Sequence, residues 1–403
     1  MNPISTASKP PIVVVAPWVY HLRCGIGGGV LCFRMLKSLS AHYDIHWISF
    51  DITSNDVEAG KIALGEFCAS VTTVPLAPPQ PLWKARARQI LGGAPVAAQR
   101  MWSPDLANAI QTVIQKTNAV VALFQFPQVA QYLPAAEGIP AVMDVQDVCM
   151  VSMHRQWQKT SGFMRRLAKV SNWFSWTRYE MRHYPKADLL LALSDTDAGV
   201  LRAFIPDTPC VLSPVATEVP DHVERGHGSY VAMVGNFHHP PNVDGLQWLL
   251  NDIWPLVRAA VPNAELRVAG PECPTPTAEL KARGVNMVGF VDDIDAYFDN
   301  AAVSLGPYRF GGGIKIKVIE ALARGCPVVA TTVGAEGLNV VDGEHIAIAT
   351  HASTFAAAIV QILQNPALAA QRGAAGRAHV SKQFSFQGKT ASLKRELDAL
   401  IAR

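Results

Sequence analysis

The 403-residue sequence lacks the features that mark secreted, membrane-spanning or nucleic-acid-binding proteins. Its seven cysteines are scattered and form no CxxC pair, which argues against a disulfide framework or a zinc site and favours a reducing compartment. No stretch approaches the ~20 apolar residues of a membrane span, and the first residues lack the apolar core of a secretion signal. The net charge of +3 gives no general argument for nucleic-acid binding. We therefore expect a cytoplasmic protein without a nucleic-acid partner.

What the sequence does contain is apolar residues, 49% of the total against 17% charged, which is typical of folded domains. The length predicts two domains at roughly 100–200 residues each. Strand-like apolar runs alternate with helical patterns, which predicts parallel sheets covered by helices on both faces. The expected strands are 12–16, 45–50, 120–124, 141–145 and 189–193, then 230–234, 265–269, 287–290, 303–305 and 328–331.

This alternation lapses at 206–228, a stretch rich in proline, glycine and polar residues. We predict an N-terminal domain over 1–210, a linker over 211–228 and a C-terminal domain over 229–380. A final helix is expected over 381–403, either within the second domain or crossing back to the first. Parallel sheets bind ligands outside the carboxyl ends of their strands, so two sheets facing a central cleft would place the site there.

The strongest functional signal is the segment 303–338, VSLGPYRFGGGIKIKVIEALARGCPVVATTVGAEGL. Three glycines precede a helix expected to begin near Ile314, and they allow close approach of the backbone to a ligand. The free N–H groups and positive dipole end of a helix start bind anions. A diphosphate is the expected ligand, held by Arg309, Gly311, Gly313, Ile314, Lys315 and Lys317.

A polar stripe runs along the same helix, formed by Lys317, Glu320 and Arg324 at spacing i, i+3, i+7. One interpretation is that the stripe is only the solvent face. The other is functional, and the glycines ahead of the helix favour it, because ordering three glycines costs backbone entropy. A carboxylate two turns into a phosphate-binding helix can reach a ribose diol, and we assign this role to Glu320.

These residues resemble the donor-binding signature of the family 4 (group 1) glycosyltransferases, which have the GT-B fold. The branch concerned has a G-x-G-x-K-x-K-x-x-E-A-x-x-x-G-x-P-V-V pattern followed by G-x-E-G. The resemblance extends upstream through 234–271 and 288–307, so it covers most of the second domain. The matching positions are Gly311, Gly313, Lys315, Lys317, Glu320, Ala321, Gly325, Pro327, Val328, Val329, Gly334, Glu336 and Gly337.

The resemblance implies an α/β protein of two Rossmann-like domains and a retaining, hexosyltransferase-type reaction with no metal and no cofactor beyond the nucleotide sugar. Its donor would lie in the C-terminal domain. Most relatives carry two glutamates seven residues apart, and here the first would fall at Gly312. Many also have a basic residue after the strand that opens this domain, where this chain has Asn236 and His238. We place both in the donor site and expect Lys317 or Arg309 to supply the missing charge, with Lys317 acting in catalysis.

The first domain resembles the family in its opening strand, glycine-rich loop and helix. Gly27 and Gly28 are expected beside the donor phosphates. A dinucleotide fingerprint is incomplete, because Val30 stands where the third glycine should be. Gln146-Asp147 occupies the place of a His-Asp pair in relatives, and Asp147 is the candidate that orients or deprotonates the acceptor hydroxyl. Capping of the next helix is the other interpretation of Asp147.

Residues 154–186 combine eight lysines and arginines with seven interleaved aromatic residues and a single acid, Glu180. Such a segment lies on an anionic membrane or meets a lipid-linked acceptor, or it is a half-buried helix whose aromatics enter the core.

The sequence therefore favours transfer of a sugar to a glycan, lipid-linked or small-molecule acceptor, with surface polysaccharide or glycolipid assembly as a family-level association. A nucleotide-sugar epimerase and a non-catalytic nucleotide-sugar or glycan-binding protein are the alternatives.

Overall fold

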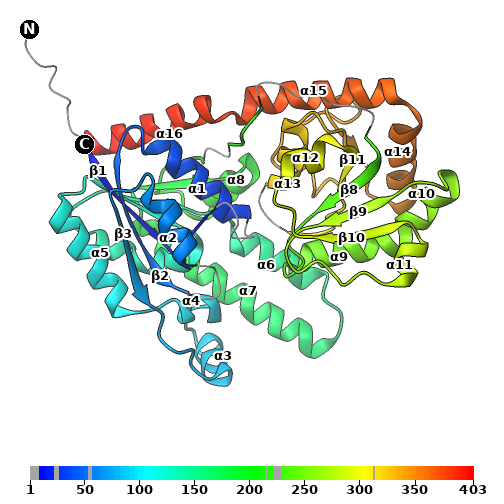
Figure 1. The fold of residues 1–403 in the computed structure, drawn as a ribbon. Coiled ribbons are helices and arrows are strands. Elements are labelled where there is room, and N and C mark those ends of the chain that lie inside the picture. Colours follow the sequence, from blue (N-terminus) through cyan, green and yellow to red (C-terminus); the bar gives the residue numbers. More distant parts are fainter. Residues whose placement is uncertain (1–8, 22–26, 53–56, 214–215, 221–227, 312–313) are drawn as a thin grey trace, which may run out of the picture. The chain divides into compact units, whose positions relative to one another are not determined.

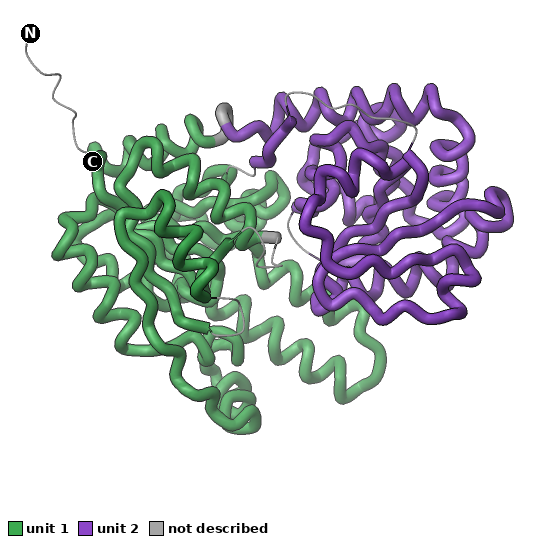
Figure 2. The backbone as a smooth tube through the Cα atoms, in the orientation of Figure 1, with its two compact units in different colours: residues 1–24, 28–214, 387–403 green, residues 25–27, 215–386 purple. Residues whose placement is uncertain are grey.

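The structure, a computed structural model, describes residues 9–21, 27–52, 57–213, 216–220, 228–311 and 314–403. The chain forms two compact units (Figure 2). Unit 1 holds residues 1–24, 28–214 and 387–403, and unit 2 holds residues 25–27 and 215–386. The main change of unit falls at the start of the stretch that the sequence marks as a linker.

Unit 1 is built on a seven-stranded sheet in the order β3-β2-β1-β4-β5-β6-β7, and every neighbouring pair is parallel. Side chains alternate along β1, so Ile12 and Val14 enter one apolar cluster while Val13 and Val15 enter another. Both faces of the sheet are therefore buried. The strands are β1 Pro11–Ala16, β2 Asp44–Asp51, β3 Ser70–Pro75, β4 Val121–Gln125, β5 Ala141–Asp144, β6 Leu189–Ala192 and β7 Cys210–Leu212.

Helices connect these strands and cover the sheet (Figure 1). The longest is α7 Phe163–His183, which packs against α6 Cys149–Gln158. The others are α1 Gly27–Leu39, α2 Val57–Gly65, α3 Leu82–Ile90, α4 Val96–Arg100, α5 Pro104–Thr117, η2 Pro127–Ala136, η3 Tyr184–Lys186 and α8 Asp195–Phe204.

The last helix, α16 Phe386–Ile401, completes unit 1. Its Leu393, Leu397 and Leu400 are buried in the apolar cluster on one face of the first sheet. The Tyr43 hydroxyl donates to the Asp398 carboxylate at 2.6 Å, which fixes the helix against the end of α1. The single helix expected over 381–403 is interrupted, because Ser385 takes an extended conformation that ends α15.

Unit 2 is built on a six-stranded parallel sheet in the order β10-β9-β8-β11-β12-β13. This order corresponds to the 3-2-1-4-5-6 winding of dinucleotide-binding folds. The strands are β8 Tyr230–Val234, β9 Leu266–Ala269, β10 Val285–Gly289, β11 Ala301–Gly306, β12 Val328–Ala330 and β13 Ala347–Ile348. The helices are α9 Pro240–Trp248, η4 Leu249–Ile253, α10 Trp254–Ala260, α11 Ala278–Ala282, α12 Ile294–Asp299, α13 Ile316–Ala323, α14 Ala352–Gln364 and α15 Pro366–Phe384.

The expectation of two parallel-sheet α/β domains is confirmed. All ten expected strands are present, with ends that differ by up to two residues. The structure adds β3, β7 and β13, which lie at sheet edges. The sequence did not reveal them because two are very short and β3 is only half-buried, so none carries a strong apolar run.

Candidate functional site

The sheet of unit 2 reverses its winding between β8 and β11, which are neighbours in space but not in sequence. Parallel sheets bind ligands at this switch point, outside the carboxyl ends of the strands. The chain leaves β8 into the loop 235–239 and leaves β11 into the loop 307–315. Six of the described residues expected to bind the donor lie in these two loops, namely Asn236, His238, Arg309, Gly311, Ile314 and Lys315.

Close contacts pack the loop 307–315 against helix α9. Gly311 has φ +124°, a conformation that favours glycine, and a Cβ there would lie 3.4 Å from the Pro241 ring. Gly245 on α9 packs against the carbonyl of Pro307, which a Cβ at Gly245 would approach to 2.8 Å. The glycine at 311 therefore meets a geometric need, as the sequence pattern predicts. Gly313 lies outside the described residues.

The helix after the glycine-rich loop, α13, begins at Ile316, two residues later than expected. Lys315 occupies the N-cap position, and its side chain makes no capping bond, since an ammonium group cannot accept one. The first N–H groups of the helix are therefore not capped by that side chain, and two lysines stand at its start. Ile314 is buried just ahead of it. This end of α13 has the electrostatic character of an anion site.

The polar stripe of α13 is not a solvent face. Glu320 is 2% exposed, and its carboxylate forms an ion pair with the Lys317 ammonium at 2.9 Å. Arg324 is also buried; it donates to the Glu320 carbonyl at 3.0 Å and pairs with Asp295 of α12. A buried carboxylate costs desolvation energy, so its retention needs a compensating partner. Lys317, 37% exposed, connects that carboxylate to the surface near the helix start.

The end of α13 fixes the position of the stripe. Gly325 has φ +65°, and its N–H donates to the Leu322 carbonyl at 2.9 Å. The N–H of Cys326 donates to the Ala321 carbonyl at 2.9 Å. These two bonds form a Schellman motif, which confirms the stop expected at Gly325.

The loop after β8 is ordered by its own polar groups. The Asn236 side-chain oxygen accepts the His238 N–H at 2.9 Å, and the Asn242 amide donates to the Asn236 carbonyl at 2.7 Å. His238 is exposed. Partial burial first, and then the charges of Lys315 and His238, lower the pKa of His239. The neutral His239 ring therefore lies within electrostatic reach of Lys315, from across the switch point.

Arg309 is exposed at the same edge but already engaged. Its guanidinium makes a two-pronged ion pair with Asp244 of α9, at 2.8 and 2.6 Å, and lies 5.7 Å from the Trp248 ring centre. An anion bound here would share Arg309 with Asp244. Sequence reasoning missed Asp244, because the two residues are 65 positions apart.

The sheet of unit 1 has a different polar group at its carboxyl edge, where β4 and β5 end. Asp144 is fully buried, and the Gln146 amide donates to its Oδ2 at 2.8 Å. Burial raises the pKa of Asp144 to about 7, against the opposing effect of Gln146, Ser213 and Gln125 around it. Asp144 Oδ1 and Gln146 Oε1 have no hydrogen-bond partner among the described residues. The sequence offers one signal for this group, a lone carboxylate inside the apolar run AVMDV.

The other expected residues of unit 1 lie near this edge. Asp147 is half-buried just before α6, and its carboxylate accepts the Ser152 hydroxyl at 2.9 Å. The N-cap residue of α6 is Val148 rather than Asp147, and both the capping and the catalytic interpretation of Asp147 stay predictions. Gly28, in the first turn of α1, packs against Phe126 and Gln146, and a Cβ there would come within 3.0 Å of the Phe126 ring. Gly27 is the first residue of that helix.

No group of three or more His, Cys, Asp or Glu side chains is placed to hold a metal ion in the described part of the chain. No helix in the same ranges is both long and apolar enough to cross a bilayer.

With this geometry established, comparison with known proteins defines the fold. A sucrose-phosphate synthase from Thermosynechococcus elongatus superposes with a TM-score of 0.72 at 16% identity, over 97% of this chain and 99% of that one. TarM of S. aureus, solved with Fondaparinux, alpha-GlcNAc-glycerol and UDP, gives 0.67 at 10% identity, over 98% and 100%. Anabaena HepE with UDP and glucose gives 0.63 at 13% identity, over 96% and 100%. The protein has the GT-B fold.

The sequence comparisons concern unit 2. Residues 228–365 match the family model described as Glycosyl transferases group 1. A curated Klebsiella pneumoniae protein, described as an uncharacterized 44.6 kDa protein in the cps region, is 30% identical over 148 residues. That match covers 34% of this chain and 38% of the relative, so the chain spans about two fifths of the relative's length. The family match over 228–365 includes β8, the glycine-rich loop and α13.

Proposed function

We propose that the protein transfers a sugar from a nucleotide-diphosphate donor to an acceptor hydroxyl. The observation that carries the proposal is the joint placement of an uncapped helix start, two lysines and a buried carboxylate beside the switch point of unit 2. The group 1 family match over the same residues supports it. So does the GT-B fold, since TarM and HepE, which share it, were solved with UDP.

The donor's diphosphate would lie against the first turn of α13. There the N–H groups, Lys315 and Lys317 would neutralise charge on the departing nucleoside diphosphate. Glu320 would accept the ribose hydroxyls, with Lys317 divided between this carboxylate and a phosphate. Arg309, Asn236 and His238 would border the same site. In this proposal the reaction is retaining. The lysines of the protein neutralise the charge of the leaving diphosphate, a function that a metal ion has in other phosphate chemistry.

The acceptor would bind at the carboxyl edge of unit 1. Asp147 would orient or deprotonate the attacking hydroxyl. The amides of Gln125 and Gln146 around Asp144 make this edge polar without fixed positive charge. Such an edge suits neutral hydroxyl groups, as a sugar or glycan acceptor presents. The cps-region relative favours surface polysaccharide assembly as the setting, on the cytoplasmic side.

The test is to screen nucleotide sugars by thermal shift, because a ligand that binds the folded state raises the melting temperature by mass action. The best donor is then assayed for release of nucleoside diphosphate with and without candidate acceptors. Release that requires an acceptor supports the transferase. Conversion of the sugar without acceptor would indicate an epimerase, and donor binding without any turnover would indicate a binding protein.

A matched pair of variants tests whether the donor binds at the start of α13. Lys317→Ala should weaken donor binding, whereas Lys382→Ala removes an exposed lysine of α15 in the same unit and should leave donor affinity unchanged. Equal donor affinity in both variants would remove α13 from the donor site.

A further inference from the structure

Helix α7 has two apolar faces, and only one of them is packed. Trp176 and Tyr179 are buried in the core of unit 1. On the opposite side, Phe163, Leu167, Phe174 and Met181 are spaced i, i+4, i+11 and i+18, which aligns them in one stripe along the helix. All four are exposed, by 80%, 55%, 59% and 47%. An apolar stripe of this length facing outward is unusual for a soluble domain and marks a binding surface.

Helix α3 and the residue that follows it also carry exposed apolar side chains. Leu82, Trp83, Ile90 and Leu91 are each exposed by 45% or more. Of the seventeen large apolar side chains exposed in the described residues, nine lie within 82–91 and 163–181. We call the surface formed by α3, α4 and α7 the α3–α7 face.

This part of the chain has a large excess of basic over acidic residues. Residues 82–100 and 149–186 contain twelve of the chain's 35 lysines and arginines but only one of its 32 acidic residues. That acid, Glu180, is buried, where its carboxylate accepts the backbone N–H groups of Cys149 and Met150 at 2.8 Å. The rest of the chain carries eight more acidic than basic residues. The α3–α7 face is therefore a local cationic region on an otherwise acidic chain.

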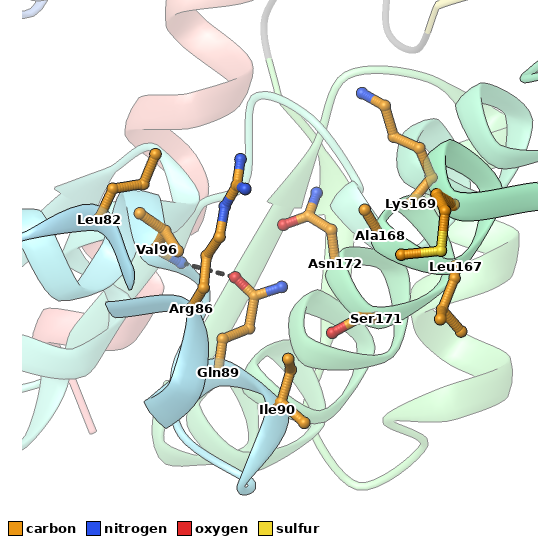
Figure 3. Close-up of a pocket in the computed structure, with 11 residues that line it drawn as sticks. Leu82, Arg86, Gln89, Ile90, Val96, Leu167, Ala168, Lys169, Ser171 and Asn172 are labelled. Carbon is orange, nitrogen blue, oxygen red and sulfur yellow. Dashed lines mark hydrogen bonds between the residues drawn. The ribbon is translucent and has the colours of Figure 1, made fainter. Parts of the chain in front are cut away.

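A groove of about 610 Å³ runs between α3 and α4 on one side and α7 on the other. Figure 3 shows Leu82, Gln89, Ile90 and Val96 facing Leu167, Ala168 and Asn172 across it, with Arg86 extending between the two sides. Its volume falls within the roughly 300–1,000 Å³ of small-molecule sites. Lys169 adds a second cation to its lining.

The groove is preformed by hydrogen bonds between its walls. Gly93, in the turn between α3 and α4, accepts from the Ser175 hydroxyl and from Arg178, both at 3.2 Å and both on α7. Within the first wall, the Val96 N–H of α4 donates to the Gln89 side chain of α3 at 3.2 Å, the bond drawn in Figure 3. The two bonds to Gly93 hold the walls together without filling the space between them.

We propose that the α3–α7 face docks on an anionic lipid bilayer, with the stripe of α7 inserted among the acyl chains and one chain entering the groove. An interfacial helix combines an apolar face that enters the bilayer with flanking lysines and arginines that attract anionic headgroups. In α7, Arg166 and Arg178 flank the stripe in this way. Arg86 and Lys169 stand where a headgroup phosphate would lie. The proposal is independent of sugar transfer and stands or falls without it.

The experiment is sedimentation of the full chain with vesicles of phosphatidylcholine alone, or with about a quarter of the lipid as phosphatidylglycerol. We expect binding to the anionic vesicles to be roughly tenfold stronger or more, and to weaken in high salt. The triple variant Phe163→Ser, Leu167→Ser, Phe174→Ser should lose most of this binding. A control triple in unit 2, Leu256→Ser, Val288→Ser, Phe290→Ser, removes three other exposed apolar side chains, by 46%, 40% and 49%, and should bind as the wild type does.

Three results would overturn the proposal. The first is no preference for anionic vesicles, and the second is equal loss of binding in both triple variants. The third is a dimer in sedimentation velocity without lipid that the α7 triple abolishes, because the stripe would then bind a second copy. Ala168→Trp fills the groove; unchanged vesicle binding would contradict its part in holding an acyl chain. Since all the substituted positions are exposed, circular dichroism of the variants should match the wild type.

Discussion

The two sheets share a winding order but present different chemistry at their carboxyl edges. In unit 2 the edge carries fixed charges, with Lys315 and Lys317 at a helix start and ion pairs to Glu320 and Asp244 beside them. In unit 1 the edge carries a buried carboxyl group surrounded by amides and a hydroxyl. Under the proposed function, one topology would serve two kinds of ligand. Paired charges suit an anion, and neutral donors and acceptors suit hydroxyl groups.

The largest effect should appear in unit 1, on replacing Asp144 by Asn. Burial raises the pKa of Asp144 from 3.8 to about 7, so between these values the folded chain keeps a proton that the unfolded chain releases. Asp144 should therefore make the free energy of unfolding fall as pH rises from about 4 to 7, by up to about 4 kcal/mol. Asp144→Asn should lose this contribution, measured as urea midpoints across pH, and keep the separate contribution of buried Glu180, whose pKa is raised to about 8.

The matched control is Asp207→Asn, which removes an exposed carboxylate from the same unit. It should keep the wild-type slope. A wild-type slope in Asp144→Asn would mean that the buried carboxyl is not the group responsible, and the contrast between the two edges would lose its basis.

The next effect concerns Lys317 in unit 2. Removing its ammonium deletes a cation from the phosphate site and leaves the Glu320 carboxylate without its ion pair. Lys317→Ala should lower kcat by about 100-fold, the size found on removing one preorganised donor from a transition-state site. Steady-state release of nucleoside diphosphate measures it, with Lys382→Ala as control. A kcat within a factor of about two of wild type would contradict the catalytic role.

A smaller and more selective effect is expected for Glu320→Gln. The amide keeps the shape but cannot accept two hydroxyls as a carboxylate does. UDP affinity should fall about tenfold, whereas inorganic pyrophosphate, which has no ribose, should bind as before or more tightly because Lys317 is released. Calorimetry with both ligands measures the difference. Parallel losses for UDP and pyrophosphate would place Glu320 elsewhere than at the ribose.

The smallest effect should follow Asp244→Asn. It frees Arg309 from an exposed ion pair, of the kind that contributes roughly 0–1 kcal/mol. Arg309 could then turn fully toward a phosphate, and UDP affinity should rise about threefold at low salt, with less gain at high salt. Weaker binding in this variant would show that Asp244 holds Arg309 in its working position.

The sequence predicted the parts of the molecule that depend on local pattern. Strong apolar runs marked ten strands, and glycine placement marked the stop of α13 at Gly325 and the loop at Gly311. Pairings between distant residues left no such trace. Asp244 with Arg309, and Asp144 with Ser213, are brought together only by the order of the strands. The burial of Glu320 and Arg324 was equally hidden, since helical spacing alone cannot distinguish a solvent face from a buried polar one.

The membership of α16 in unit 1 has a consequence for synthesis. Leu393, Leu397 and Leu400 complete a core whose strands leave the ribosome first, whereas unit 2 comes almost wholly from the continuous run 215–386. During translation the second unit can therefore close before the first has received its last helix. Until α16 is synthesised, the apolar cluster that it covers on the sheet of unit 1 stays exposed. A chain that ends before residue 393 would leave this cluster accessible to chaperones and proteases.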